Sequence, residues 1–361
     1  MEQVEGKLNT LLSIAEECVE VSELKALIVS GAPMVFYDGF EPSGRMHIAQ
    51  GLLRAINVNK ITSIGGKFIF YVADWFALMN LKLGGDLEKI RNAGRLMIEI
   101  WKASGMKMEN VQFIWASEEI ATRSADYWHL VLDIATKFNI TRVKKCTPIM
   151  GRDIPQQEQD EKQTKDPVDE LPMSVLLYAV MQCADIPFLK VNVASLGIDQ
   201  RKVLMMNREY AAKLKQKHPP IALMHHMLLG LNGQKMSKSD PENAIFMDDQ
   251  EADVNRKLKK ALCEPGKVSP NPILEYVKYI IFEKDASLTV ERSDKNGGNI
   301  TFNSYGELEK AFVDGLLHPG DLKPTVAKII NGYLSSVRQA LDSNPESKEL
   351  VKKVASYKIT K

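Results

Sequence analysis

Hydrophobic residues follow two alternating patterns along the first part of the chain. Short apolar runs at 34–37, 67–73 and 111–115 predict buried strands. Between them, apolar positions recur at helical spacing, from residue 46 onward and over 87–104. Strands that alternate with helices are typical of a parallel sheet with crossover helices, so we expect an α/β fold.

The flanking patterns set the limits of this α/β domain, which we place at residues 33–245. Before it, helical spacing over 8–29 predicts an N-terminal helical segment at 1–32. Within it, a further helix is expected at 173–184 and a further strand at 189–193. The polar stretch at 150–172, which is broken by prolines, belongs to a connecting insertion of about 115–172.

The pattern changes near residue 245, after which helical spacing dominates. We therefore expect a second, mainly helical domain over 246–361. Its predicted helices cover residues 251–262, 272–282, 306–315 and 323–341.

Composition limits the class of protein without identifying it. The 361 residues contain 47 Lys and Arg against 46 Asp and Glu, a net charge of +1. This balance argues against a polycation and against an acidic disordered chain, but it does not exclude nucleic acid, which local basic clusters can bind. Four scattered cysteines form no metal-binding motif, and no apolar run has the length of a membrane span. We expect a cytoplasmic protein without a tightly bound metal.

The first chemical motif runs from Tyr37 to Gln50, YDGFEPSGRMHIAQ, where a strand enters a Gly/Pro/Ser turn and then a helix. Such a turn places backbone N–H groups and a helix N-terminus at the carboxyl end of a strand, which suits a phosphate chain. We expect Gly44, His47 and Gln50 to lie there. Alone, however, a histidine at this position is more often structural.

The second motif is KMSKS at residues 235–239, in a glycine-bounded loop that we place at 230–241. Its two lysines, Lys235 and Lys238, and the hydroxyl of Ser237 could neutralise the charge that develops on departing pyrophosphate. Either motif alone is weak, but together they are typical of class I aminoacyl-tRNA synthetases.

The third signal is a polar face on the helix expected at 173–184. Tyr178, Gln182 and Asp185 follow one another at intervals of four and three residues, so they share one side of that helix. Their neighbours are apolar, and buried polar groups need partners. This face predicts either an internal network or a pocket for a polar amino acid, which Gln200 would enter from the next strand end.

Together these motifs resemble the tyrosyl-tRNA synthetases of the archaeal and eukaryotic type. The resemblance runs from about residue 35 to the C-terminus and rests on YDGFEPSG, YAVMQCADI, GIDQRK, KMSKS, NGGNITFNSYGELE and LHPGDLK. It implies a Rossmann-like catalytic domain, an anticodon-binding helical domain, a homodimer, and L-tyrosine, Mg²⁺-ATP and tRNA(Tyr) as substrates.

The resemblance also assigns roles to individual residues. Tyr37 and Asp185 would hold the substrate phenol, and Tyr178, Gln182 and Gln200 its ammonium and carboxylate groups. ATP would contact the first two motifs, through Gly44, His47, Gln50, Lys235, Ser237 and Lys238. For tRNA we expect contacts from Arg142, Lys144, Lys145, Arg201, Lys202 and Asp321. A further basic group is as consistent with a solvated surface as with a tRNA contact; it contains Arg256, Lys257, Lys259 and Lys260.

The chain departs from the family pattern at two positions. Gln50 replaces the second histidine of the usual His-Ile-Gly-His, so a cationic role there is lost. Asn296 stands where relatives often place an aromatic residue that stacks on an anticodon base.

Three alternatives stay open at this stage. A tryptophanyl-tRNA synthetase would share the fold and both loops, but its indole substrate gives no use for Tyr37 paired with Asp185. Another nucleotidyltransferase would lack the LHPGDLK region. A non-catalytic RNA-binding protein would not need the two lysines of KMSKS.

Overall fold

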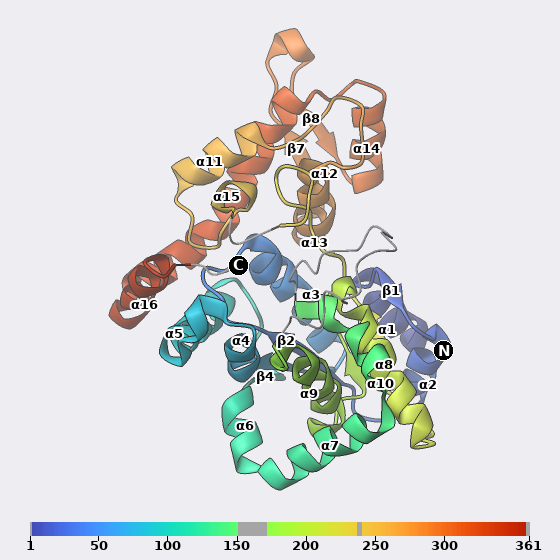
Figure 1. Cartoon of the computed structure of the whole chain (residues 1–361). Coiled ribbons are helices and arrows are strands. Elements are labelled where there is room, and N and C mark those ends of the chain that lie inside the picture. Colours follow the sequence, from blue (N-terminus) through green and yellow to red (C-terminus); the bar gives the residue numbers. More distant parts are fainter. Residues whose placement is uncertain (1, 151–171, 237–239, 359–361) are drawn as a thin grey trace, which may run out of the picture.

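A six-stranded sheet lies at the centre of the first two-thirds of the chain (Figure 1). The computed structural model describes residues 2–150, 172–236 and 240–358. The strands follow the order β1-β6-β5-β2-β3-β4, and all neighbours are parallel except β1 with β6. The strands are β1 (Glu17–Cys18), β2 (Val35–Phe40), β3 (Lys67–Val72), β4 (Val111–Trp115), β5 (Val193–Ala194) and β6 (Ile221–Met224).

Helices cover both faces of this sheet. Alternate residues of β2 and β3 point to opposite sides, so that Phe36 and Phe70 join one buried cluster while Tyr37 and Tyr71 join the other. The α-helices of this domain are α1 (Glu2–Ser13), α2 (Val21–Ser30), α3 (Arg54–Ser63), α4 (Asp74–Met79), α5 (Leu87–Ala103), α6 (Ala116–Thr122), α7 (Ser124–Lys137), α8 (Ile140–Lys144), α9 (Ser174–Phe188) and α10 (Arg201–Lys213). Shorter turns are the π-helical η1 (Ala49–Leu53) and the 3₁₀ turns η2 (Lys82–Gly85), η3 (Thr147–Met150) and η5 (Ile198–Gln200).

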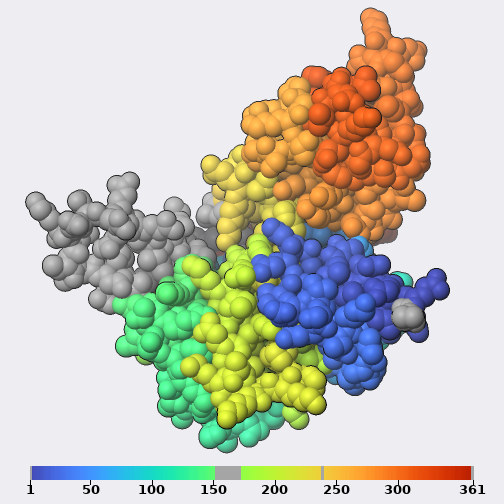
Figure 2. Space-filling model, turned by 90° about the vertical axis from the view of Figure 1, so that its right-hand side faces the viewer, coloured from blue at the N-terminus to red at the C-terminus, as the bar shows by residue number. Residues whose placement is uncertain are grey.

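The C-terminal residues form a separate lobe, orange to red in Figure 2. Its α-helices are α11 (Glu251–Lys260), α12 (Pro272–Tyr276), α13 (Phe282–Lys284), α14 (Tyr305–Val313), α15 (Pro319–Ser343) and α16 (Pro345–Ala355). It also holds the turns η6 (Pro241–Asn243), η7 (Val277–Ile281) and η8 (Asp294–Asn296) and the hairpin of β7 (Leu288–Val290) with β8 (Ile300–Phe302). The last helix returns to the α/β domain, where α16 packs against α5 and Asn92 donates to the Tyr357 hydroxyl at 3.0 Å.

The first part of the chain differs from the sequence-based expectation in two respects. The single helix expected over residues 8–29 is two helices, because Glu16 donates its N–H to Met224 at 2.8 Å and β1 pairs with β6. The strand expected at 189–193 begins only at Val193, since α9 continues to Phe188 and Lys190 adopts a positive φ of 54°. The sheet is accordingly mixed rather than wholly parallel.

His226, two residues after β6, joins three parts of the molecule. Its Nδ1 lies 3.0 Å from Glu16 Oε2 and its Nε2 lies 3.4 Å from Glu275 Oε1 on α12, while its ring stacks on Tyr279. Burial opposes the charged imidazole, but the hydrogen bonds and charges of Glu275 and Glu16 raise the pKa of His226 above its ordinary value. This contact ties the N-terminal segment to the C-terminal lobe.

No helix within the described ranges is long and apolar enough to cross a bilayer.

Candidate active site

The two loops that carry the ATP motifs are held close together by backbone pairing. Ile48 donates to Ile245 at 2.8 Å and Met247 donates to Met46 at 2.9 Å, so the His47 turn pairs with the chain that follows KMSKS. Because residues 244–247 are fully buried, this pairing anchors the far end of the loop beside the first motif. The structure therefore places the chain that follows KMSKS beside a motif almost 200 residues earlier.

The first motif folds as a turn leading into a helix, as expected. Gly44 is buried with a φ of 125°, a conformation that disfavours side chains, and Gln50 donates its N–H to His47 Nδ1 at 3.4 Å. The Gln50 side chain keeps one buried oxygen, Oε1, without a hydrogen-bond partner among the described residues. An amide oxygen cannot take over a cationic role, so His47 remains the one ring donor of this motif.

The second motif is described only in part. Lys235 is exposed, and its Nζ lies 3.3 Å from Asp199 Oδ2 in the turn that also carries Gln200. This contact places the lysine on the same side as the amino-acid pocket. The predicted ATP contacts Ser237 and Lys238 lie outside the described residues.

A buried phenol and a buried carboxylate meet where β2 packs against α9. The Tyr37 hydroxyl donates to Asp185 Oδ2 at 3.4 Å, and both side chains are about 1% exposed. Burial raises the pKa of Asp185 well above its ordinary value, although hydrogen bonds from surrounding tyrosines oppose that shift. A buried carboxylate beside a phenol suits a ligand that itself carries a phenol.

The polar face of α9 continues from this pair toward the sheet edge. Gln182 donates to Gln200 Oε1 at 3.0 Å, and Gln200 donates to the Ile149 carbonyl at 3.2 Å. Tyr178 is buried, and burial together with the charge and hydrogen bond of Glu41 raises its pKa well above the ordinary value. The five predicted tyrosine-site residues thus fall into a Tyr37–Asp185 pair, a Gln182–Gln200 pair and Tyr178 beside Glu41, with Tyr178, Gln182 and Asp185 all on α9.

Sequence reasoning missed three members of this site. Glu41 lies beside Tyr178 and accepts from Asn80 at 2.9 Å, so it could meet an ammonium group. Tyr71 on β3 and Tyr127 on α7 surround Asp185. Glu41 belongs to the YDGFEPSG motif and could have been selected, whereas nothing in the spacing of Tyr127 points to Asp185.

An ion pair lies buried behind the Tyr37 strand. Arg54 Nε is 2.9 Å from Asp38 Oδ2, and both side chains are at most 5% exposed. Arg54 also donates to the Ser195 carbonyl at 2.5 Å, and His225 Nε2 lies 3.7 Å from the same Asp38 oxygen. The pair therefore connects β2 with the residues that follow β5 and β6, all of which border the site.

Five of the six residues expected to contact tRNA, all except Asp321, fall into two groups. Lys145 and Lys202 are exposed and Lys144 is half-buried. Two arginines instead hold acidic partners, because Arg142 pairs with Glu209 and Arg201 with Glu17, each with contacts of 3.1 Å or less.

The basic group of α11 contains one residue that cannot face solvent. Lys257 is 4% exposed, and its Nζ lies 2.7 Å from Asp249. It therefore belongs to the buried face of α11, together with Val254 and Leu258. Arg256 pairs with Glu242 and Asp253. A surface track through Lys257 is excluded.

At the far end of the C-terminal lobe, Asn296 and Asp321, the two residues for which the family resemblance suggested an anticodon role, contact each other directly. Asn296 donates to Asp321 Oδ1 at 3.1 Å. Next to them, His318 and Lys323 border a cavity of about 710 Å³ between α11 and α15. The amide of Asn296 therefore helps to orient the carboxylate at this end of the molecule.

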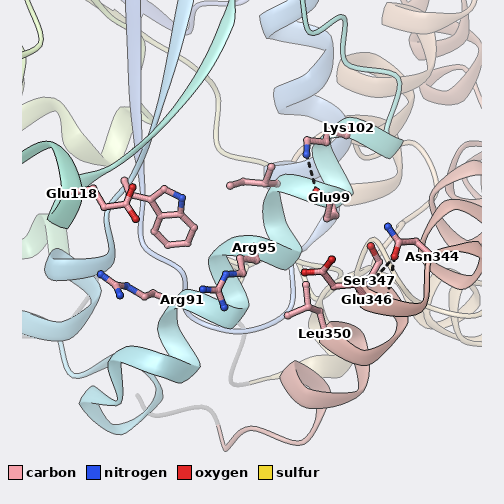
Figure 3. A pocket seen from close by; sticks show the side chains of 11 residues that line it. Arg91, Arg95, Glu99, Lys102, Glu118, Asn344, Glu346, Ser347 and Leu350 are labelled. Atoms are coloured by element: carbon pink, nitrogen blue, oxygen red, sulfur yellow. Dashed lines mark hydrogen bonds and ion pairs between the residues drawn. The ribbon is translucent and has the colours of Figure 1, made fainter.

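A second hollow lies beside the contact between α5 of the α/β domain and α16 of the C-terminal lobe. Figure 3 shows Arg91, Arg95 and Lys102 on its α5 side and Asn344 and Glu346 opposite them on the C-terminal lobe, around a space of about 330 Å³. None of the predicted site residues lines it.

Comparison with known proteins places this geometry in a family. The family model "tRNA synthetases class I (W and Y)" matches residues 30–335. Tyrosine–tRNA ligase 1, cytoplasmic, from Arabidopsis thaliana is 48% identical, with 100% of this chain and 91% of that protein aligned. The crystal structure of tyrosyl-tRNA synthetase from Aeropyrum pernix superposes with a TM-score of 0.85 at 35% identity, covering 98% of this chain and 99% of that one.

A third relative is longer than this chain. Leishmania major tyrosyl-tRNA synthetase in complex with tyrosinol is 44% identical with a TM-score of 0.88, and the match covers 98% of this chain but 53% of that protein. This chain thus spans about half of the Leishmania protein. By its family model, its relatives and its structure, the chain belongs to the tyrosine–tRNA ligase family of the class I tRNA synthetases.

Proposed function

We propose that this protein attaches L-tyrosine to tRNA(Tyr) in two steps at the site described above. The observation that carries the proposal is the buried pairing of Tyr37 with Asp185, which supplies both a donor and an acceptor for a phenolic hydroxyl. The Arabidopsis and Aeropyrum relatives, at 48% and 35% identity, are both named as tyrosine enzymes, which supports the same substrate. A tryptophan enzyme and a non-catalytic RNA-binding protein are not favoured.

In the first step, an oxygen of the tyrosine carboxylate attacks the α-phosphorus of ATP. The bond from the α-phosphorus to the bridging oxygen breaks, and pyrophosphate leaves while tyrosyl-adenylate forms. Lys235, with Lys238 and Ser237 beyond the described residues, would offset the charge on pyrophosphate, and Gly44, His47 and Gln50 would contact the phosphates. Magnesium enters with ATP as part of the substrate.

In the second step, a hydroxyl of the 3′-terminal ribose of tRNA attacks the tyrosyl carbonyl, and AMP leaves. Neither step needs a strong protein base, so positioning and electrostatics carry the rate. Gln182, Gln200 and Glu41 would fix the polar end of tyrosine for this purpose. Lys144, Lys145, Lys202 and, after exchange of their acidic partners, Arg142 and Arg201 would meet the tRNA backbone, while Asp321 would meet an anticodon base.

We further propose that the enzyme is a cytoplasmic homodimer. Trp128 and Leu132 lie one turn apart on α7 and are 39% and 64% exposed, with Ile140 and Met173 exposed as well. Exposed apolar side chains, two of them one turn apart on α7, suit an interface with a second copy. The cytoplasmic assignment is supported by the name of the Arabidopsis relative.

The test is an amino-acid panel in ATP–pyrophosphate exchange, followed by tRNA charging. Exchange should require tyrosine and should not respond to tryptophan or phenylalanine. Lys235→Ala should lower the rate of exchange by about tenfold or more, since it removes a charge from the pyrophosphate side. The matched control is Lys353→Ala, which removes an exposed lysine paired with one acid, Glu349, on α16 and outside both motifs. Exchange driven by tryptophan, or equal rates in the two variants, would contradict the proposal.

A further inference from the structure

Within the described part of the chain, Asp185 is surrounded by phenols. Its Oδ1 accepts a hydrogen bond from the Tyr127 hydroxyl at 2.9 Å, and its Oδ2 accepts one from Tyr37 at 3.4 Å. Tyr71 faces the same carboxylate closely enough to lower its pKa, although its buried hydroxyl forms no hydrogen bond of regular geometry. Among the described residues, no Lys, Arg or His pairs with Asp185. Its charge is therefore balanced by hydroxyl dipoles alone.

Tyr127 has one proton and two acceptors for it. Besides Asp185 Oδ1 at 2.9 Å, the Met181 carbonyl lies 3.3 Å from its hydroxyl. A hydrogen bond to an ionised acceptor is the shorter and stronger of two such choices, so the proton goes to Asp185 while that group is a carboxylate. If Asp185 were protonated, its own O–H could donate to Tyr127, which would then turn its proton toward Met181. The direction in which the Tyr127 hydroxyl donates thus depends on the protonation state of Asp185. Its stronger hydrogen bond is the one to the ionised form, so Tyr127 stabilises the carboxylate.

This arrangement fixes what Asp185 can offer a ligand. With Oδ1 engaged by Tyr127, the oxygen left toward Tyr37 is an acceptor, and an acceptor is satisfied by a phenolic O–H but not by the C–H of a phenyl ring. We propose that Tyr127, reaching in from α7 in the connecting insertion, is a positioning residue that holds Asp185 as a hydrogen-bond acceptor and so helps the enzyme to select tyrosine over phenylalanine. The inference rests on the proposed function.

The directions of the pKa shifts of Asp185 and the tyrosines around it agree with this role. Burial raises the pKa of Asp185, and the hydrogen bond from Tyr127 is the largest influence that lowers it. The groups that face Asp185 are Tyr37, Tyr71 and Tyr127, and burial raises the pKa of each, so all three remain neutral donors near pH 7. Loss of the Tyr127 hydroxyl therefore moves Asp185 further toward its protonated form.

The experiment compares Tyr127→Phe with the wild-type enzyme in ATP–pyrophosphate exchange, using tyrosine and phenylalanine as substrates. A lost hydrogen bond to a charged group predicts that the KM for tyrosine rises by about tenfold or more and that the preference for tyrosine falls by about ten- to a hundredfold. The kcat for tyrosine should change little. The raised KM should fall again as the pH is raised, because Asp185 then loses its proton.

The matched control is Tyr210→Phe. Tyr210 on α10 is also buried. Its hydroxyl donates at 2.7 Å to Asp133, which lies on α7 like Tyr127 but is a different carboxylate from Asp185. It should leave the tyrosine preference unchanged. A Tyr127→Phe enzyme with a preference and a KM within twofold of wild type would overturn the inference, whereas a wild-type enzyme without tyrosine-dependent exchange would overturn the proposed function instead.

If Tyr127→Phe does not fold, the wild-type enzyme still tests the inference. An acceptor carboxylate should favour 4-aminophenylalanine, which can donate a hydrogen bond, over 4-fluorophenylalanine, which cannot. The reverse order would show that Asp185 acts as a donor and would overturn the inference.

Discussion

Removing the Arg54 guanidinium tests how the strand that carries Tyr37 is held in place. Arg54 and Asp38 are at most 5% exposed and 2.9 Å apart. Among the described residues, Arg54→Met leaves this buried acid with His225 Nε2, at 3.7 Å, as its one nearby basic group. Removal of one partner from a buried pair costs about 3–5 kcal/mol. The bond to the Ser195 carbonyl is lost as well. We expect a decrease in unfolding free energy within that range.

A double-mutant cycle separates the interaction energy of the Arg54–Asp38 pair from the energy lost with side-chain packing. Asp38→Asn alone should cost a similar amount, because it leaves the guanidinium buried without its acid. The double variant should be much less destabilised than the sum of the two, since neither charge then remains alone. Urea unfolding followed by tryptophan fluorescence reports these free energies.

The control is Arg201→Met, which breaks the exposed pair with Glu17, whose side chains are 50% and 34% exposed. It should cost at most about 1 kcal/mol. A loss below about 1 kcal/mol for Arg54→Met, or costs of the two single changes that simply add, would refute the reasoning that burial makes this pair interdependent.

Two further predictions concern stability. The raised pKa of His226 means that its charged form contributes stability that is fully present below the ordinary value of about 6.5 and is lost as the pH rises through the raised pKa. His226→Gln should therefore lower the thermal midpoint more at pH 6 than at pH 9, and an equal effect at both would contradict this. In Gly94→Ala the new Cβ would lie 2.6 Å from the Trp115 ring, which predicts a cost of about 1–3 kcal/mol by thermal or urea unfolding. Gly306→Ala on α14, where nothing lies within 4 Å, should be neutral or stabilising, and equal losses in the two variants would argue against steric overlap.

Much of the site follows from local patterns. Strand and helix periodicity placed Tyr37 at the end of a buried strand and Asp185 on a buried helix face, and the structure confirms that the two meet. The resemblance assigned the motif around His47 and the KMSKS loop to one ATP site, and the pairing of Ile48 with Ile245 places the chain that follows this loop beside the first motif.

Other features depend on tertiary contacts that no local pattern encodes. Lys257 looks like a surface residue in sequence, but a neighbouring acid, Asp249, makes its burial possible. Tyr127 belongs to an amphipathic helix whose docking on α9, and not its own spacing, brings its hydroxyl to Asp185. The break between α1 and α2 similarly arises from a partner strand 200 residues away.

The return of α16 to α5 has a mechanical meaning. The C-terminal lobe is joined to the α/β domain where residues 244–247 pair with the His47 turn and again where α16 packs against α5. A body fixed at several separated points, the His226 contact included, cannot swing as it could on a single linker. The span from the proposed tyrosine pocket to Asp321 is then a set length, and the tRNA of the proposed function would have to match that length in its own shape.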